Sequence, residues 1–255
     1  MANFSVAAIF SDHMVLQRNK FISVFGYGDD GLKIEARLFS SENELLSQNT
    51  GFIVNGRWDL KLDPQVARTN CSLQILCQDS TQNSSIEFSD IAIGEVWIAG
   101  GQSNMEFELQ NCTEGPDELK LKDNPNIRFY YTNKIAWKDE HFYQAEKATA
   151  WQTWNSEWKK AWSAVGYFFG KKLAEDLDCT VGIIGCNWGG TSASAWMRKE
   201  FLEKDDDLRT YLTEQEEATK GKSIEQQCKE YDDYVVENDA WQIKCNELYA
   251  TVPGI

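Results

Sequence analysis

"VWIAGGQSNMEF", residues 96–107, places four apolar residues directly before two glycines and a serine. A short apolar run bounded by glycine is typical of a strand that is buried on both faces of a parallel sheet. Gly100 and Gly101 then allow the backbone to turn sharply. Because sites in α/β sheets form beyond the carboxyl ends of the strands, Ser103 is a candidate nucleophile. The alternative is an ordinary N-cap serine at a strand-to-helix turn.

Four blocks of the sequence resemble the sialate O-acetylesterases, members of the SGNH (GDSL-like) hydrolase superfamily. In chain order they are "FSDHMVLQR" (10–18), "GEVWIAGGQSNMEF" (94–107), "SAVGYFFGKKL" (163–173) and "NWGGTSASAWM" (187–197). The resemblance implies hydrolysis of acetyl esters on sugars, with Ser103 as the nucleophile.

A second glycine pair follows another apolar run. Val181 to Cys186 predict a buried strand, so Gly189 and Gly190 should lie at the same sheet edge as Ser103. The resemblance implies an oxyanion hole made by the amides of Ser103 and Gly190, with Gly189 as the next choice. The alternative is that both glycines only permit a tight turn. Asn187 could also donate a hydrogen bond, but the family's oxyanion asparagine lies in a later block, so Asn187 is not included.

Three consecutive elements indicate a parallel crossover. Ile127 to Tyr131 predict a strand, Ser163 is a suitable helix N-cap, and the strand at 181–186 follows. The intervening helix should present a face that repeats every four residues, formed by Val165, Phe169, Leu173 and Leu177.

From Phe21 to about Ile91, apolar and polar residues alternate as in half-buried strands. Asn55-Gly56 is a strong hairpin signal, because both turn positions require positive φ. These short strands predict a small β-sandwich, and the resemblance implies an immunoglobulin-like one. The apolar positions form three sets: Ile34, Ala36 and Leu38; Trp58, Leu60 and Leu62; Leu73, Ile75 and Cys77.

The predicted fold class is therefore α/β with three segments. We expect the N-terminal β-sandwich at 1–92, a parallel-sheet SGNH hydrolase domain at 93–198 that is incomplete at its C-terminus, and an acidic helical segment at 199–255. One helix stripe of the last segment should contain Cys228, Tyr231, Val235, Asn238, Trp241, Cys245 and Leu248.

A serine nucleophile needs a base, normally a histidine oriented by a carboxylate. The chain has two histidines, His13 and His141, and the Asp-x-x-His pair that the family carries near its C-terminus is absent. We therefore expect a truncated family member without its acid and base. His141 is a weak candidate base, and the resemblance assigns His13 a structural role.

Composition limits the remaining choices. The net charge of −15 argues against nucleic-acid and anionic-membrane partners, and it would repel an anionic sugar unless the local pocket is basic or neutral. Seven cysteines without metal-ligand spacing are expected to be reduced and mostly buried. No pattern implies a cofactor or a metal. No leader or membrane span is visible, which predicts a cytoplasmic protein if this start is native, and a secreted or periplasmic one if a leader was removed.

Three functions remain open at this point. The first is a sialate O-acetylesterase, the second an acetylxylan or other polysaccharide acetylesterase, and the third a non-catalytic glycan-binding or inert fragment. An incomplete sheet could be covered by a second copy of the chain in a homo-oligomer. Four tryptophans could stack on sugar rings or pack in a core: Trp151, Trp154, Trp158 and Trp162.

Overall fold

The computed structural model describes residues 3–78, 83–135 and 140–250, without the side chains of His141, Tyr249 and Ala250. Backbone contacts divide the chain into two compact units, one of residues 1–134 with 140–191 and the other of residues 135–139 with 192–255. Each unit is described by itself. The domain boundaries at 92 and 198 stay predictions.

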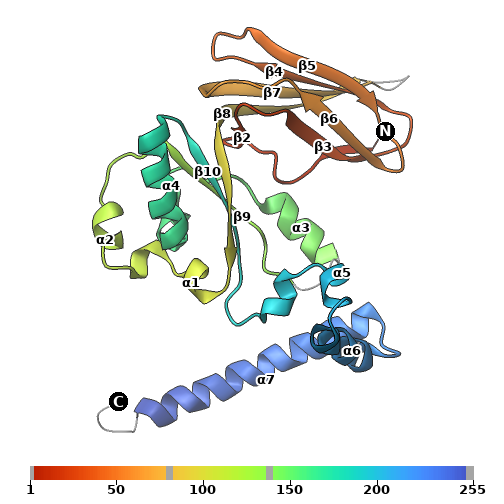
Figure 1. Cartoon of the computed structure of the whole chain (residues 1–255), viewed down its shortest axis with the longest axis vertical. Helices are drawn as coiled ribbons and strands as arrows, with labels where there is room; N and C mark the ends of the chain where they lie inside the picture. Colours follow the sequence, from red (N-terminus) through yellow and green to blue (C-terminus); the bar gives the residue numbers. More distant parts are fainter. Residues whose placement is uncertain (1–2, 79–82, 136–139, 251–255) are drawn as a thin grey trace. The chain divides into compact units, whose positions relative to one another are not determined.

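The first unit is a mixed α/β structure with two sheets (Figure 1). The smaller sheet has the order β1-β3-β6 and is antiparallel, with β1 at Phe4–Val6, β3 at Ile22–Gly28 and β6 at Arg57–Leu62. The larger sheet has the order β5-β4-β7-β8-β10-β9, and β2 pairs with β8. Its strands are β2 (Val15–Gln17), β4 (Lys33–Phe39), β5 (Leu45–Phe52), β7 (Arg68–Gln78), β8 (Asn83–Gly101), β9 (Ile127–Tyr131) and β10 (Val181–Asn187).

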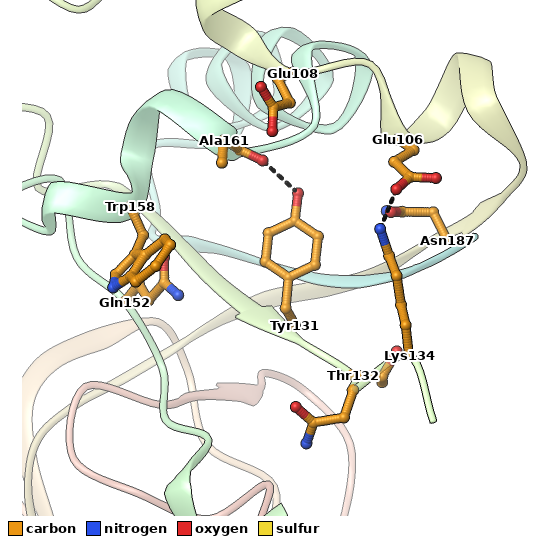
Figure 2. Close-up of a pocket in the computed structure, with 10 residues that line it drawn as sticks. Glu106, Glu108, Tyr131, Thr132, Lys134, Gln152, Trp158, Ala161 and Asn187 are labelled. Atoms are coloured by element: carbon orange, nitrogen blue, oxygen red, sulfur yellow. Dashed lines mark hydrogen bonds and ion pairs between the residues drawn. The ribbon is translucent and has the colours of Figure 1, made fainter. Parts of the chain in front are cut away.

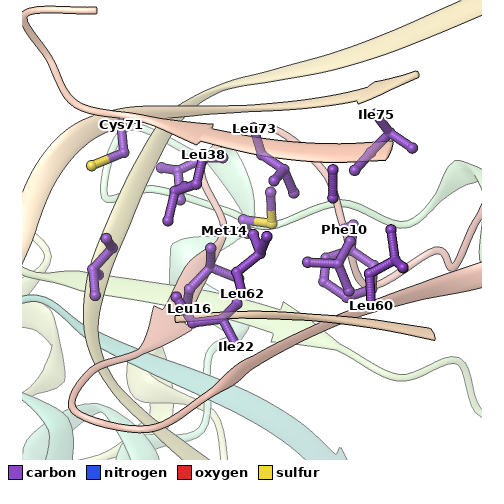
Figure 3. Packing of buried hydrophobic residues seen from close by; sticks show 14 of the residues in the cluster. Phe10, Met14, Leu16, Ile22, Leu38, Leu60, Leu62, Cys71, Leu73 and Ile75 are labelled. Carbon is purple, nitrogen blue, oxygen red and sulfur yellow. The ribbon is translucent and has the colours of Figure 1, made fainter. Parts of the chain in front are cut away.

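The first hydrophobic core is built by strands of both sheets, in which every second residue points inward (Figure 3). Residues of β4, β6 and β7 alternate between buried and more accessible positions, as the period of two predicts. All nine residues of the three predicted apolar sets are buried. The turn between β5 and β6 is also confirmed: Asn55 has φ +54° and Gly56 φ +73°, and Val54 and Arg57 are bridged across it.

Strand β8 connects the antiparallel part of the larger sheet to its parallel part. Its first half pairs antiparallel with β7, and its last seven residues pair parallel with β10. Strand β10 pairs parallel with β9 on its other side. The predicted strand at Ile127–Tyr131 and its parallel neighbour at 181–186 are therefore confirmed, with β10 one residue longer.

The predicted helix is α4 (Ala164–Leu177), and the Ser163 hydroxyl caps it by accepting the Gly166 N–H at 3.0 Å. The predicted packing face is wrong. Val165, Phe169 and Leu177 are exposed, and the helix instead buries small residues against the sheet. A methyl group added at Gly166 would lie 3.2 Å from Ile183. The glycine face lets the helix axis approach the sheet more closely than a leucine face could.

Helix α4, β9 and β10 contribute to a second hydrophobic core, which is rich in aromatic rings. Phe129 stacks on Trp162 with ring centroids 4.5 Å apart, and Trp154 stacks on Tyr167 at 5.3 Å. Trp154 and Trp162 each place the indole N–H on an oxygen acceptor, at 3.0 and 2.7 Å. Burial of large rings with their polar atoms satisfied accounts for the packing role of these tryptophans.

The prediction that residues 96–99 are buried on both faces is also wrong. Trp97 is 45% exposed and Ile98 is 72% exposed. Over residues 95–101, β8 pairs with β10 on one side, and no described strand pairs with its other side. Trp97 packs edge-on against Phe169 of α4, at a ring separation of 5.3 Å. Whether a second copy of the chain covers this edge stays a prediction.

Short helices complete the first unit: α1 (Ser103–Glu106), η1 (Leu109–Asn111), α2 (Gly115–Glu118), α3 (Glu140–Ala148) and η2 (Glu157–Ala161). The second unit is helical, as predicted, with η3 (Ala193–Trp196), α5 (Lys199–Leu202), α6 (Asp206–Thr219) and α7 (Ile224–Ala250). The predicted stripe lies on α7, but Tyr231, Trp241 and Leu248 are exposed within it.

The β8–β10 junction generates a stability prediction. An added methyl at Gly94 would lie 1.9 Å from the Thr180 carbonyl oxygen, whereas one at Gly100 would meet nothing closer than 3.6 Å. We expect Gly94→Ala to lower the free energy of unfolding by about 3 kcal/mol, because backbone must move. Gly100→Ala in the same strand should change it by less than about 1 kcal/mol. Urea unfolding of both variants measures the difference, and equal values would contradict this packing.

Candidate active site

Ser103 lies directly after β8, at the carboxyl end of the parallel strands. Gly101 ends the strand with φ +151°, and Ser103 is the first residue of α1. The serine is exposed, as a nucleophile must be. Glycine suits the positive φ at position 101 because it has no Cβ.

The second glycine turn meets Ser103 at this edge. Asn187, the last residue of β10, is opposite Gly101, and the Trp188 N–H donates to the Gly101 carbonyl at 2.9 Å. A Cβ built on Gly189 would lie 3.6 Å from the Ser103 Cα and Cβ. Gly190 has φ +77° and open space around its Cβ position. The structure thus brings the serine and the glycine turn together.

Glu106, which sequence reasoning missed, ties this turn to α1. Its carboxylate accepts a hydrogen bond from the Lys134 ammonium (Figure 2). It also accepts one from the Gly189 N–H. Burial disfavours the charged carboxylate, but the hydrogen bonds from Lys134 and Gly189 outweigh it, so the Glu106 pKa lies below its ordinary value. The Gly189 amide is thereby engaged, and the Gly190 amide has no hydrogen-bond partner among the described residues.

A pocket of about 360 Å³ opens beside Glu106 (Figure 2). Its walls come from the ends of β9 and β10, from α1 and from η2 with the segment before it. The lining residues are Glu106, Glu108, Tyr131, Thr132, Asn133, Lys134, Gln152, Trp158, Ala161 and Asn187. Of the four tryptophans named above, Trp158 is the exposed one, at 67%, and it lines this pocket.

Tyr131 forms the floor of the pocket and stays neutral. Its hydroxyl accepts the Ser163 N–H at 2.6 Å and donates to the Ala161 carbonyl at 3.4 Å. Burial raises the Tyr131 pKa to about 12, although the Ser163 N–H and the nearby Asn187 amide oppose the shift. Tyr131 is therefore protonated at neutral pH and does not supply a base.

Asn187 is a second residue that sequence reasoning did not include in the site. It is 5% exposed, it lines the pocket, and its Nδ2 makes no hydrogen bond of good geometry. A buried amide without a partner costs free energy, which a bound oxygen would recover. Its position as the last residue of a strand next to the serine strand is the sequence signal for it.

The two histidines do not complete the site within the described structure. His13 Nδ1 lies 2.6 Å from Asp90 Oδ2, and Asp90 also pairs with Arg128 at 3.0 Å. Asp90 is in the first half of β8, away from the end that carries Ser103. His141 lies in α3, but its side chain is outside the described residues.

No group of three or more histidine, cysteine, aspartate or glutamate side chains is placed to hold a metal ion in the described part of the chain. None of the helices described is long and apolar enough to cross a membrane.

An exposed serine, a glycine turn against it and a pocket thus lie at the carboxyl edge of parallel strands, which is where α/β folds usually carry their sites. A sequence model of the carbohydrate esterases described as sialic acid-specific acetylesterases matches residues 93–226, just over half of the chain. The chain belongs to this family, which confirms the resemblance.

Individual relatives agree with this assignment. Sialate O-acetylesterase of Homo sapiens is 25% identical over 210 residues, covering 78% of this chain and 40% of the human protein. The Mus musculus enzyme is 24% identical over 211 residues, covering 78% of this chain and 38% of its own length. The chain thus spans about two fifths of the length of these curated relatives.

A solved structure has a similar fold. The crystal structure of a carbohydrate acetylesterase from Xanthomonas citri matches with a TM-score of 0.66 at 23% identity, covering 81% of this chain and 45% of that chain. At this identity the likeness concerns the fold.

The Glu106 network generates a pH prediction. A lowered pKa means that the charged carboxylate stabilises the fold above its unfolded pKa of about 4.3, and that this stability disappears as pH falls through the folded pKa. Since the Glu106 side chain is 33% exposed, we expect Glu106→Gln to cost about 1 kcal/mol at pH 7. The cost should begin to fall as pH drops through about 4.3 and should disappear once the pH lies below the folded pKa. Denaturant unfolding over a series of pH values from about 7 downwards measures it, with exposed Glu87→Gln on β8 as the control. A cost that does not change with pH would contradict the ionic role.

Proposed function

We propose that the chain carries the nucleophile of a carbohydrate O-acetylesterase, and that Ser103 is this nucleophile. The observation that supports the proposal is the close approach of the Gly189 turn to Ser103, beside a pocket with sugar-sized volume. Family membership supports the reaction class. The immunoglobulin-like character of the N-terminal sheets and the SGNH type of the parallel strands belong to the same proposal.

The chemistry would proceed through an acetyl-enzyme. Ser103 Oγ attacks the acetyl carbonyl carbon and loses its proton to a base, and the bond between that carbon and the sugar oxygen breaks. Water then attacks the acetyl group, which releases acetate and frees the serine. The amides of Ser103 and Gly190 would hold the oxyanion. Engagement of the Gly189 amide by Glu106 favours Gly190 over Gly189 as the second donor.

The base stays unassigned within this chain. His13 is held by Asp90, and the His141 side chain lies outside the described residues. His141 stays the candidate to test if the chain proves active by itself. Two substrates remain: O-acetylated sialic acid, which the names of the relatives indicate, and a neutral O-acetylated polysaccharide such as acetylxylan. Glycan binding without hydrolysis is the non-catalytic alternative.

Ser103→Ala tests the proposal directly. We expect it to remove the hydrolysis of p-nitrophenyl acetate that the unchanged chain shows above the uncatalysed rate, because the acetyl-enzyme would form on the serine oxygen. Folding should be unchanged, since the Ser103 side chain is exposed. Ser84→Ala, an exposed serine in the first half of the same strand, is the matched control.

Hydrolysis above the uncatalysed rate that is unchanged in Ser103→Ala would refute the nucleophile. Serine-dependent turnover by this chain would make His141→Ala the next variant, because a base must then be present.

A further inference from the structure

We propose that the pocket beside Glu106, at the same sheet edge as Ser103, selects an uncharged O-acetylated sugar over one that carries a carboxylate, such as sialic acid. The inference rests on the proposed function, because it concerns the substrate of the same site. It depends on the charges that line the pocket, on an unpartnered buried amide and on one exposed indole.

The charged groups of the pocket do not favour an anion. Its described lining has two carboxylates, Glu106 and Glu108, and one ammonium, Lys134. Lys134 is already paired with Glu106, so its charge is compensated within the protein. Glu108 pairs with no cation among the described residues: its Oε2 accepts hydrogen bonds from the side-chain amides of Gln110 at 2.5 Å and Asn111 at 3.2 Å. The described lining of the pocket therefore carries a net negative charge.

A sugar carboxylate would enter this pocket against the charge of Glu108, and the described lining offers it no uncompensated cation. The interaction is strongest at short range, where little water lies between the charges. The net charge of −15 on the chain acts in the same direction over longer distances. Neither the short-range nor the long-range repulsion acts on a neutral sugar.

The uncharged groups of the pocket suit hydroxyls and a sugar ring. Asn187 offers a buried N–H without a partner. Gln152 uses its Oε1 to accept the Trp162 indole N–H at 2.7 Å, which orients its amide nitrogen as a further donor. Glu108 can accept a hydrogen bond from a hydroxyl through its other oxygen. Trp158 presents a largely exposed indole, a flat apolar surface against which sugar C–H groups can pack.

The decisive experiment compares two ligands that differ by one charge. The methyl glycoside of O-acetylated N-acetylneuraminic acid and its methyl ester are titrated into the whole chain carrying Ser103→Ala, which prevents loss of acetate. Calorimetry at pH 7 and low salt should give a dissociation constant about tenfold lower for the ester. An acetylated methyl xyloside should also bind, and added salt should reduce the difference between ester and acid. Equal affinities, or tighter binding of the acid, would overturn the proposal.

Variants locate the effect in this pocket. Glu108→Gln should reduce the ratio between ester and acid severalfold, whereas Glu87→Gln, an equal charge change on β8, should leave it unchanged. Trp158→Ala should weaken binding of the xyloside about tenfold, and Trp241→Ala on α7 should have no effect. Binding of the xyloside that ignores Trp158, or no binding of any sugar at millimolar concentration, would also overturn it.

The two proposals fail separately. The nucleophile is judged on p-nitrophenyl acetate, which contains no sugar, and the pocket is judged on binding by a chain that lacks the serine hydroxyl. A selective pocket together with catalysed hydrolysis that does not depend on Ser103 would refute only the proposed function.

Discussion

Parallel pairing between β8 and β10 is the constraint on which the candidate site depends. The register sets Asn187 opposite Gly101, and the Trp188 N–H continues the ladder by donating to the Gly101 carbonyl at 2.9 Å. Both strands therefore end at the same level, and each is followed by glycine where the chain must turn. A shift of one residue would move Asn187 to the other face of the sheet and separate Gly189 from Ser103.

Both very small and very large side chains pack against these strands. Glycines on α4 bring the helix close to Ile127 and Ile183, while Trp154, Trp162, Tyr167 and Phe129 fill the space beside it. Stacked rings with satisfied N–H groups add specific geometry to their large buried area. Trp154 and Trp162 anchor both ends of the segment that contains Trp158, which places this exposed indole at the pocket.

Local patterns were sufficient for much of the fold. Alternation predicted β4, β6 and β7, Asn55-Gly56 predicted the hairpin turn, and the glycine pairs predicted where Ser103 and the second turn meet. The packing face of α4 was missed because hydrophobic periodicity counts large side chains and ignores glycine as a contact residue. Exposure of Trp97 and Ile98 depends on which strands flank β8, which no local pattern contains. The Glu106 network joins residues 28 and 83 positions apart, so only the folded chain brings them together.

Strand β8 extends from the first core to Gly101, two residues before Ser103. Its regular geometry is disturbed at one described position, Asp90, which has φ +49°. Trp151 strengthens the connection by donating its indole N–H to the Ile9 carbonyl at 2.8 Å. Elements that share a strand tend to open together in hydrogen exchange, because local opening follows contiguous cooperative units. Opening of the N-terminal sheets is therefore expected to loosen the turn that carries Ser103. The N-terminal half thus supports the stability of this turn without lining the described pocket.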